Sequence, residues 1–179
     1  MEVNWITLVF LAGAFQALVL LIGINVREPL QGIRKRLVSG LLLTVFLIIL
    51  YYATVLAGNE TMLPYLDSLG SAAWMALFPL FFLISKVLTE QDWTPGWQAL
   101  LLFPLTIIFL VEGLITTLGV KFWLYQQVSY PLFLDIWMAY FFGTGFVFLW
   151  LSLKQARRHS GAPFTREIIW AAYGFLVLL

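Results

Sequence analysis

Long uninterrupted runs of apolar residues constrain this chain more than any other feature. A transmembrane helix needs roughly 20 consecutive apolar residues. Five runs meet that length, and a sixth begins near the end of the sequence. They are residues 5–26, 37–57, 71–88, 97–118 and 131–153, followed by 168–179. The runs are continuous rather than alternating, and a barrel strand needs only about 10 residues. The pattern therefore predicts an all-α, polytopic transmembrane helix bundle with five complete helices and the start of a sixth.

The composition supports the same interpretation. The chain is 62% hydrophobic and only 11% charged, whereas a soluble domain carries about 25% charged residues. Too few charges remain to cover a water-facing surface, so part of the solvent must be lipid. Residues 1–179 are therefore interpreted as a single transmembrane domain whose first partner is the bilayer.

The same composition excludes several kinds of chemistry. The chain has no cysteine and one histidine, His159. Disulfides, thiolate catalysis and cysteine metal sites are excluded, and a lone histidine cannot form a metal cluster. No phosphate loop, nucleophile elbow or zinc-protease motif occurs in a suitable context. The prediction is a protein that is not an enzyme, with no catalytic residue, metal site or cofactor.

The distribution of lysine and arginine predicts the orientation. Of the ten basic residues, all except Lys121 lie in or beside the connections that follow odd-numbered helices. These are Arg27, Arg34, Lys35, Arg36, Lys86, Lys154, Arg157, Arg158 and Arg166. Short loops rich in Lys and Arg stay in the cytoplasm. The basic loops are therefore expected to be cytoplasmic and the N-terminus to lie outside.

The last apolar segment is too short to cross a bilayer. About 12 residues span roughly 18 Å as a helix, against a hydrocarbon core of about 30 Å. A carboxylate at Leu179 would then lie at high cost within the membrane. We expect the chain to continue beyond this residue. The alternative is a re-entrant or interfacial last helix.

Three polar residues at membrane depth are candidate ligand-binding residues. Glu112 lies in the fourth apolar segment, Asp135 in the fifth and Gln16 in the first. Ionisable residues within a membrane are costly and are a default hypothesis for a functional site. One interpretation is a ligand or proton site between the fourth and fifth helices that opens outward. The alternative is that the acids are hydrated or hydrogen-bonded near the interface, and that Gln16 only packs against another helix.

Two basic clusters are candidate contacts for lipid headgroups. One comprises Arg34, Lys35 and Arg36, and the other Arg157, Arg158 and His159. Each basic residue near an anionic leaflet contributes about 1 kcal/mol to binding. The alternative is that these residues determine topology alone.

Four short strings, taken in order, resemble the membrane-sensor half of bacterial AraC-type transcription regulators. They are residues 11–18, 77–83 and 102–104, then 151–153 with the following Arg157, Arg158 and His159. The aromatic Trp170 near the start of the last segment is similar too. The chain departs from the family at Phe78, where a glycine is usual, and it lacks the family's histidine before Phe103.

The resemblance implies a seven-helix bundle in the full chain, in the bacterial cytoplasmic (inner) membrane, with the N-terminus outside. The seventh helix would lead to a cytoplasmic helix-turn-helix domain, which is absent from these residues and would be the only part to contact DNA. A homodimer is expected for such a regulator. The resemblance thus predicts a sensory domain that couples an envelope or membrane cue to a DNA-binding output. It identifies no particular ligand.

Two alternatives stay open. The same kind of sensor can precede a histidine kinase. The chain can also be a small multi-pass transporter or assembly protein, which predicts polar residues along a continuous path. The polar residues within the apolar segments are scattered: Gln16, Thr44, Thr54, Glu112 and Asp135.

Overall fold

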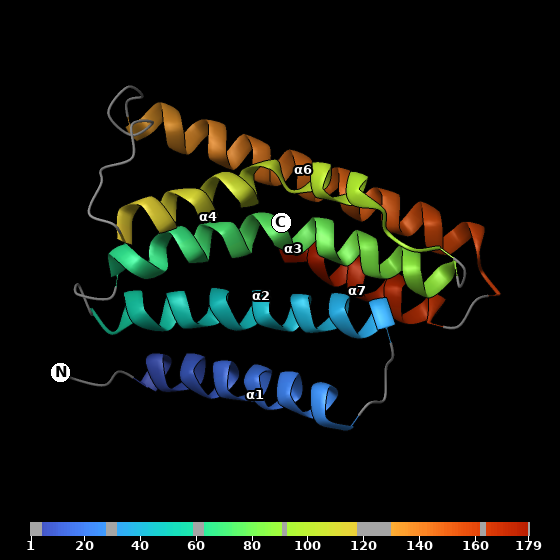
Figure 1. The fold of residues 1–179 in the computed structure, drawn as a ribbon, viewed down its shortest axis with the longest axis horizontal. Helices are drawn as coiled ribbons and strands as arrows, with labels where there is room; N and C mark the ends of the chain where they lie inside the picture. Colours follow the sequence, from blue (N-terminus) through green and yellow to red (C-terminus); the bar gives the residue numbers. More distant parts are fainter. Residues whose placement is uncertain are drawn as a thin grey trace. The chain divides into compact units, whose positions relative to one another are not determined.

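The computed structural model describes residues 5–27, 32–58, 63–90, 93–117, 130–161 and 164–178. These residues are mostly helical, and no strand occurs among them (Figure 1). The helices are α1 (Trp5–Arg27), α2 (Gly32–Leu56), α3 (Leu63–Thr89), the short 3₁₀ helix η1 (Trp97–Leu102), α4 (Pro104–Thr117), α6 (Tyr130–Arg158) and α7 (Thr165–Leu178). The prediction of an all-α helix bundle is confirmed.

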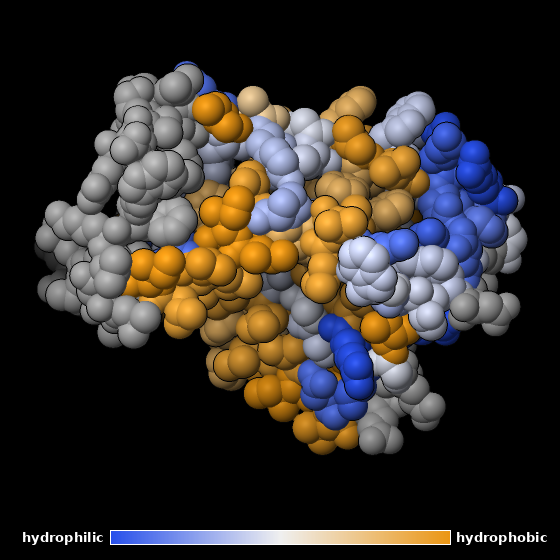
Figure 2. Space-filling model, turned by 45° about the horizontal axis from the view of Figure 1, so that its top comes forward, coloured by the Kyte–Doolittle hydropathy of each residue, from blue (hydrophilic) through white to orange (hydrophobic). Residues whose placement is uncertain are grey.

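Four of the described helices are long and apolar enough to cross a membrane. These segments are Trp5–Val26, Gly32–Leu56, Leu66–Thr89 and Asp135–Arg158. Large hydrophobic side chains are exposed along them, among them Phe15, Val19 and Phe146. Figure 2 shows that hydrophobic residues cover much of the drawn surface, while hydrophilic residues gather in a few patches. Such exposed apolar area is suited to contact with lipid.

The fourth apolar segment, 97–118, is not one helix. The 3₁₀ helix η1 ends at Leu102 and α4 begins at Pro104. Proline disfavours helical geometry in the residue before it and is suited to the first position of a new helix. The α-helical part has only 14 residues, which is about 21 Å at 1.5 Å per residue. It is thus shorter than the four candidate spans.

Four other helices extend beyond their predicted ends. Helix α2 begins at Gly32 rather than at 37, and α7 begins at Thr165 rather than at 168. Helix α3 begins at Leu63 rather than at 71, and α6 ends at Arg158 rather than at 153. The extension of α6 matters because Lys154, Arg157 and Arg158 become helical residues instead of loop residues. Their side chains therefore project at helical spacing from a rigid element.

The described helices divide into two compact units. The first lies within Met1–Leu77 and Phe103–Lys121 and contains α1, α2, the first part of α3, and α4. The second lies within Phe78–Leu102 and Phe122–Leu179 and contains the rest of α3, η1, α6 and α7. Helix α3 therefore contributes to both units, and Pro79 lies within it.

In the first unit, α1 and α2 form an antiparallel hairpin (Figure 1). At its closed end, Asn25 Nδ2 donates a hydrogen bond to Ser39 Oγ at 3.0 Å. Lys35 Nζ in turn donates to the Asn25 carbonyl at 2.9 Å. In the middle, a Cβ on Gly13 would lie 3.7 Å from Ile49 Cδ1, so the two helices are in close contact there.

Helix α2 packs closely on the first part of α3. A Cβ on Gly70 would lie only 2.7 Å from Tyr51 Cγ, so the absence of a side chain at Gly70 permits the contact. The Tyr51 hydroxyl donates to Asp67 Oδ1 at 3.1 Å one turn earlier on α3. Tyr52 and Trp74 add an edge-on ring contact with centroids 6.1 Å apart.

In the second unit, the last part of α3 runs parallel to α6. The Phe78 ring lies 5.2 Å from the Phe141 ring, and Phe82 lies 5.8 Å from Phe148, so the pairs advance together along both helices. Helix α7 runs antiparallel to α6, and its Phe175 lies 5.3 Å from Phe81. Four small side chains on these helices are fully buried, namely those of Ser85, Ser152, Ala156 and Ala172.

Candidate functional site

A cluster of polar side chains joins the ends of α3 and α6 to the start of α7 in the second unit. We call Thr89, Glu90, Gln155, His159 and Thr165 the polar cluster. Gln155 Nε2 donates a hydrogen bond to Glu90 Oε1 and lies 3.4 Å from Thr89 Oγ1. His159 Nδ1 lies 3.3 Å from the same amide nitrogen. Thr165 Oγ1 donates to the His159 carbonyl at 3.0 Å, which ties α7 to the end of α6.

The polar cluster specifies how the helices align. An amide NH₂ has two donors, and Gln155 directs them at residues on the neighbouring helix end and at His159. Sliding α3 by one residue against α6 would break these bonds while leaving apolar contacts largely intact. Glu90 and His159 are the cluster's only titratable side chains, and no group of three or more metal-ligating side chains occurs among the described residues. The role of the polar cluster in this arrangement is to hold the register of three helices.

The end of α3 carries one further polar contact. Lys86 Nζ lies 4.4 Å from the centroid of the Trp93 ring. This distance is within the range of a cation–π interaction, which contributes about 0.5–1 kcal/mol at exposed sites. The contact holds the chain that follows α3 against the helix end.

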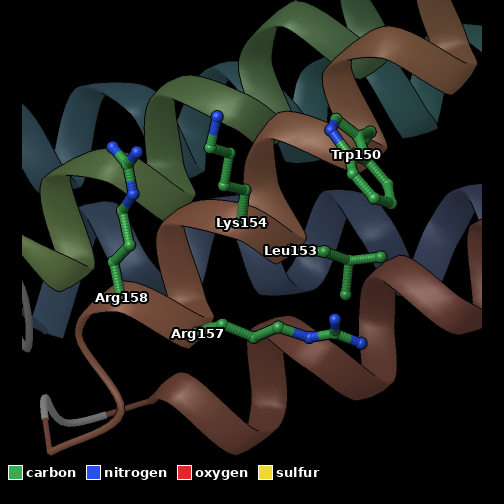
Figure 3. Close-up of a pocket in the computed structure, with 5 residues that line it drawn as sticks. All are labelled: Trp150, Leu153, Lys154, Arg157 and Arg158. Carbon is green, nitrogen blue, oxygen red and sulfur yellow. The ribbon is translucent and has the colours of Figure 1, made fainter.

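On another face of α6, a shallow cavity of about 320 Å³ is lined by Trp150, Leu153, Lys154, Arg157 and Arg158. We call this cavity the basic groove (Figure 3). Its residues follow the spacing i, i+3, i+4, i+7 and i+8, which places side chains on one face of a helix. Lys154 and Arg158 extend from α6 in the same direction, and Arg157 extends toward α7. Three cations thus share one concave surface.

The cations of the basic groove are held by few interactions. Arg157 Nη2 donates to the Tyr173 hydroxyl on α7 at 3.3 Å. Lys154 and Arg158 are exposed. None of the three cations forms an ion pair with a carboxylate in the part of the chain that the structure describes. No carboxylate of the described residues therefore offsets their mutual repulsion.

Helical geometry separates the two sets of polar residues on α6. Ser152, Gln155 and His159 have the spacing i, i+3 and i+7 and point toward the packed helices. Arg157 and Arg158 are exposed in the basic groove. The sequence predicts that His159 joins these arginines in a headgroup cluster. In the structure His159 bonds within the polar cluster and Lys154 lies beside the arginines, and a role of His159 in headgroup binding stays a prediction.

The other basic cluster lies at the start of α2 in the first unit. Lys35 is bound to the Asn25 carbonyl and so closes the helical hairpin. Arg34 is partly exposed and Arg36 is exposed. The role of these residues in headgroup binding stays a prediction.

Of the three predicted ligand-binding residues, one is buried and two are exposed. Glu112 on α4 is 6% exposed. Its neighbour Gly113 lies so close to α3 that a Cβ there would be 3.1 Å from Ser68 Cβ. Asp135 is exposed on α6. Gln16 is exposed on α1, so the described helices do not bury its amide. Glu112 and Asp135 belong to different compact units, and a shared site for them stays a prediction.

Comparison with protein-family models, curated protein sequences and solved structures found no match for this chain. The resemblance to the sensors of AraC-type regulators therefore stays a prediction.

Sequence reasoning missed Thr89, Glu90 and Gln155. A signal was present, because polar or small residues recur every three or four positions on each helix. On α3 these are Ser85 and Thr89, and on α6 they are Ser152, Gln155 and His159. Such a stripe in an apolar helix indicates a face that packs against another helix.

Proposed function

We propose that this chain is the membrane-embedded sensory domain of a bacterial transcription regulator. In this proposal it couples an envelope or membrane cue to a cytoplasmic DNA-binding output. The proposal joins the resemblance of the four strings to two properties of the structure. These are the candidate membrane spans and the division of the helices into two units.

The observation that carries the proposal is the position of Pro79 in α3. The chain passes from the first unit to the second between Leu77 and Phe78, and Pro79 lies within the same helix two residues after Leu77. Proline cannot donate the bond that the Met75 carbonyl would accept, which weakens the helix locally. A sensor needs an element with two arrangements that a cue can bias. In this proposal the weakened turn of α3 at Pro79 is that element.

The polar cluster then provides a route toward the output. It links the end of α3 to α6 through Gln155 and links α6 to the start of α7 through Thr165. A change in α3 at Pro79 would be transmitted through these bonds to α7. In the proposal, α7 precedes the segment that leads to the DNA-binding domain.

The distribution of basic residues supports the proposed orientation. Because α3 and α6 run parallel and α7 returns antiparallel, Lys86, Lys154, Arg157, Arg158 and Arg166 gather near one end of the second unit. Under the positive-inside rule this end is cytoplasmic. The proposed N-terminus is then outside, in the bacterial cytoplasmic membrane.

The complete gene product tests the proposed output. The proposal requires a further apolar segment and then a soluble helix-turn-helix region after residue 179. A kinase-like region there would keep the sensory role and change the output. A stop codon shortly after this position would contradict the proposal and favour the transporter or assembly alternative, for which buried Glu112 would be the first residue to test.

A Pro79→Ala variant of the complete protein tests the proposed mechanism. We expect it to restore the missing backbone hydrogen bond in α3 and to change the abundance of regulated transcripts at least fivefold in RNA sequencing, with unchanged protein level in the membrane fraction. Pro95→Ala is the control, because Pro95 lies in the non-helical segment before η1. Unchanged transcripts in the Pro79→Ala strain, or the same change in both strains, would overturn the mechanism.

A further inference from the structure

The basic groove is a concave surface of the described second unit that carries three cations. Its three cations line a cavity of about 320 Å³, a volume at the lower end of the range of about 300–1,000 Å³ typical of small-molecule sites. Guanidinium groups bind phosphate oxygens through paired N–H donors, and an ammonium adds a point charge. The groove therefore has the chemistry of a phosphate site.

The position of the basic groove on α6 indicates that the phosphate belongs to a membrane lipid. The candidate membrane span Asp135–Arg158 ends within the groove. Trp150 is 58% exposed at the apolar side of the groove. Tryptophan is enriched where the apolar core of a bilayer meets its headgroups. The three cations lie one to two helical turns after Trp150 on α6. With Trp150 at the interface, this is the depth of the lipid phosphates.

We propose that the basic groove binds the phosphate of an anionic membrane lipid. Lys154 and Arg158, which extend in the same direction, hold the phosphate oxygens, Arg157 adds its charge from the side of α7, and Trp150 packs beside the upper acyl chain. Arg157 is oriented by its bond to Tyr173, so a lipid bound there contacts both α6 and α7. This proposal does not depend on a DNA-binding output, because the groove consists only of residues of this chain.

The test measures lipid binding to the purified chain by native mass spectrometry from detergent. Phosphatidylglycerol and phosphatidylcholine are titrated separately. We compare the wild-type chain with the Lys154→Gln/Arg158→Gln variant. These residues are exposed and are not bonded to other described side chains, so their replacement should leave the fold intact. The matched control is Arg34→Gln/Arg36→Gln, which removes the same charge from the other basic cluster.

We expect wild-type protein to retain phosphatidylglycerol in preference to phosphatidylcholine. A basic residue near anionic lipid contributes about fivefold in affinity. Lys154→Gln/Arg158→Gln should therefore lower phosphatidylglycerol affinity at least fivefold relative to Arg34→Gln/Arg36→Gln. Equal losses in the two variants would overturn the proposal, because only general charge attraction would then operate.

Two further experiments distinguish a membrane lipid from a soluble phosphate. Trp150→Ala should lower phosphatidylglycerol retention about threefold or more, whereas binding of a soluble phosphate would not respond to this residue. Inorganic phosphate is also titrated into the lipid-free chain. Binding of inorganic phosphate that depends on Lys154 and Arg158, without a preference for phosphatidylglycerol, would overturn the lipid assignment in favour of a soluble phosphate.

Discussion

Gln155 on α6 donates a hydrogen bond to Glu90, the residue that follows the last residue of α3. The bond joins residues 65 positions apart in sequence, at the same end of two parallel helices. Apolar rings between α3 and α6 hold these helices together but tolerate sliding. The Gln155 amide defines which turn of α6 faces the end of α3.

Replacement of Gln155 by alanine should weaken the second unit. The change removes the donor to Glu90 and the contacts with Thr89 and His159. Hydrogen bonds between membrane helices contribute about 0.6–2 kcal/mol each, so we expect the free energy of unfolding to fall by about 1–2 kcal/mol. The measurement is an SDS titration in mixed micelles followed by circular dichroism. Gln98→Ala is the control, because Gln98 is exposed on η1. Equal stability of the two variants would contradict the assigned role of Gln155.

Replacement of Gly70 by alanine should separate α2 from the first part of α3. The new Cβ would lie 2.7 Å from Tyr51 Cγ and 3.0 Å from Tyr51 Cβ. Neither atom is the free end of a flexible chain, so the helices must move. Overpacking of this kind costs about 1–3 kcal/mol, measured by the same titration.

Gly23→Ala serves as the matched control for Gly70. A Cβ on Gly23 meets nothing within 4 Å. Alanine favours the helix by about 0.8–1.0 kcal/mol over glycine, so this variant should be as stable as the wild-type chain or more stable. A Gly70→Ala variant that behaves like Gly23→Ala would show that the α2–α3 contact is looser than the structure has it.

Replacement of Ala156 by leucine should disturb the packing of α6 without changing any charge. Ala156 has no exposed area, whereas Ala139 on the same helix is exposed. We expect Ala156→Leu to lower the free energy of unfolding by about 1–3 kcal/mol. Ala139→Leu should change it by less than about 0.5 kcal/mol. Similar values for the two variants would show that the buried face of α6 is assigned wrongly.

Single cysteines can map the topology, because the natural chain contains none. In spheroplasts, a membrane-impermeant maleimide should label the Glu2→Cys and Asn59→Cys variants. The Ser160→Cys variant should react only after lysis. This pattern follows from the positive-inside rule applied to the basic loops. Labelling of Ser160→Cys in intact spheroplasts would reverse the proposed orientation.

A Gln126→Cys variant tests whether the interrupted fourth segment crosses the membrane. If residues 97–118 span, position 126 is outside and is labelled together with Glu2→Cys. The structure has a 3₁₀ helix, a break at Phe103 and a 14-residue α4 in this segment. Labelling of Gln126→Cys only after lysis would show that this segment does not cross.

Much of the helical architecture follows from local sequence. A run of about 20 apolar residues has few stable forms in lipid, because every backbone polar group needs an internal partner. The break before α4 was also present in the sequence, since Pro104 disfavours helical geometry at Phe103. The apolar character of residues 97–118 masked that local signal. Even so, no single sequence feature indicated the division of α3 between two units.

The sequence by itself determined that this chain is helical, apolar and charged mainly at helix ends. These properties follow from the residues within each segment and need no contact with distant parts of the chain. Only the tertiary structure decided which face of α6 each polar residue occupies. Residues 152, 155 and 159 point toward neighbouring helices, while 154, 157 and 158 line an open groove. The physical reason is that neighbours in sequence are rotated by about 100° around a helix. Which side is inside then depends on helices contributed by distant parts of the chain.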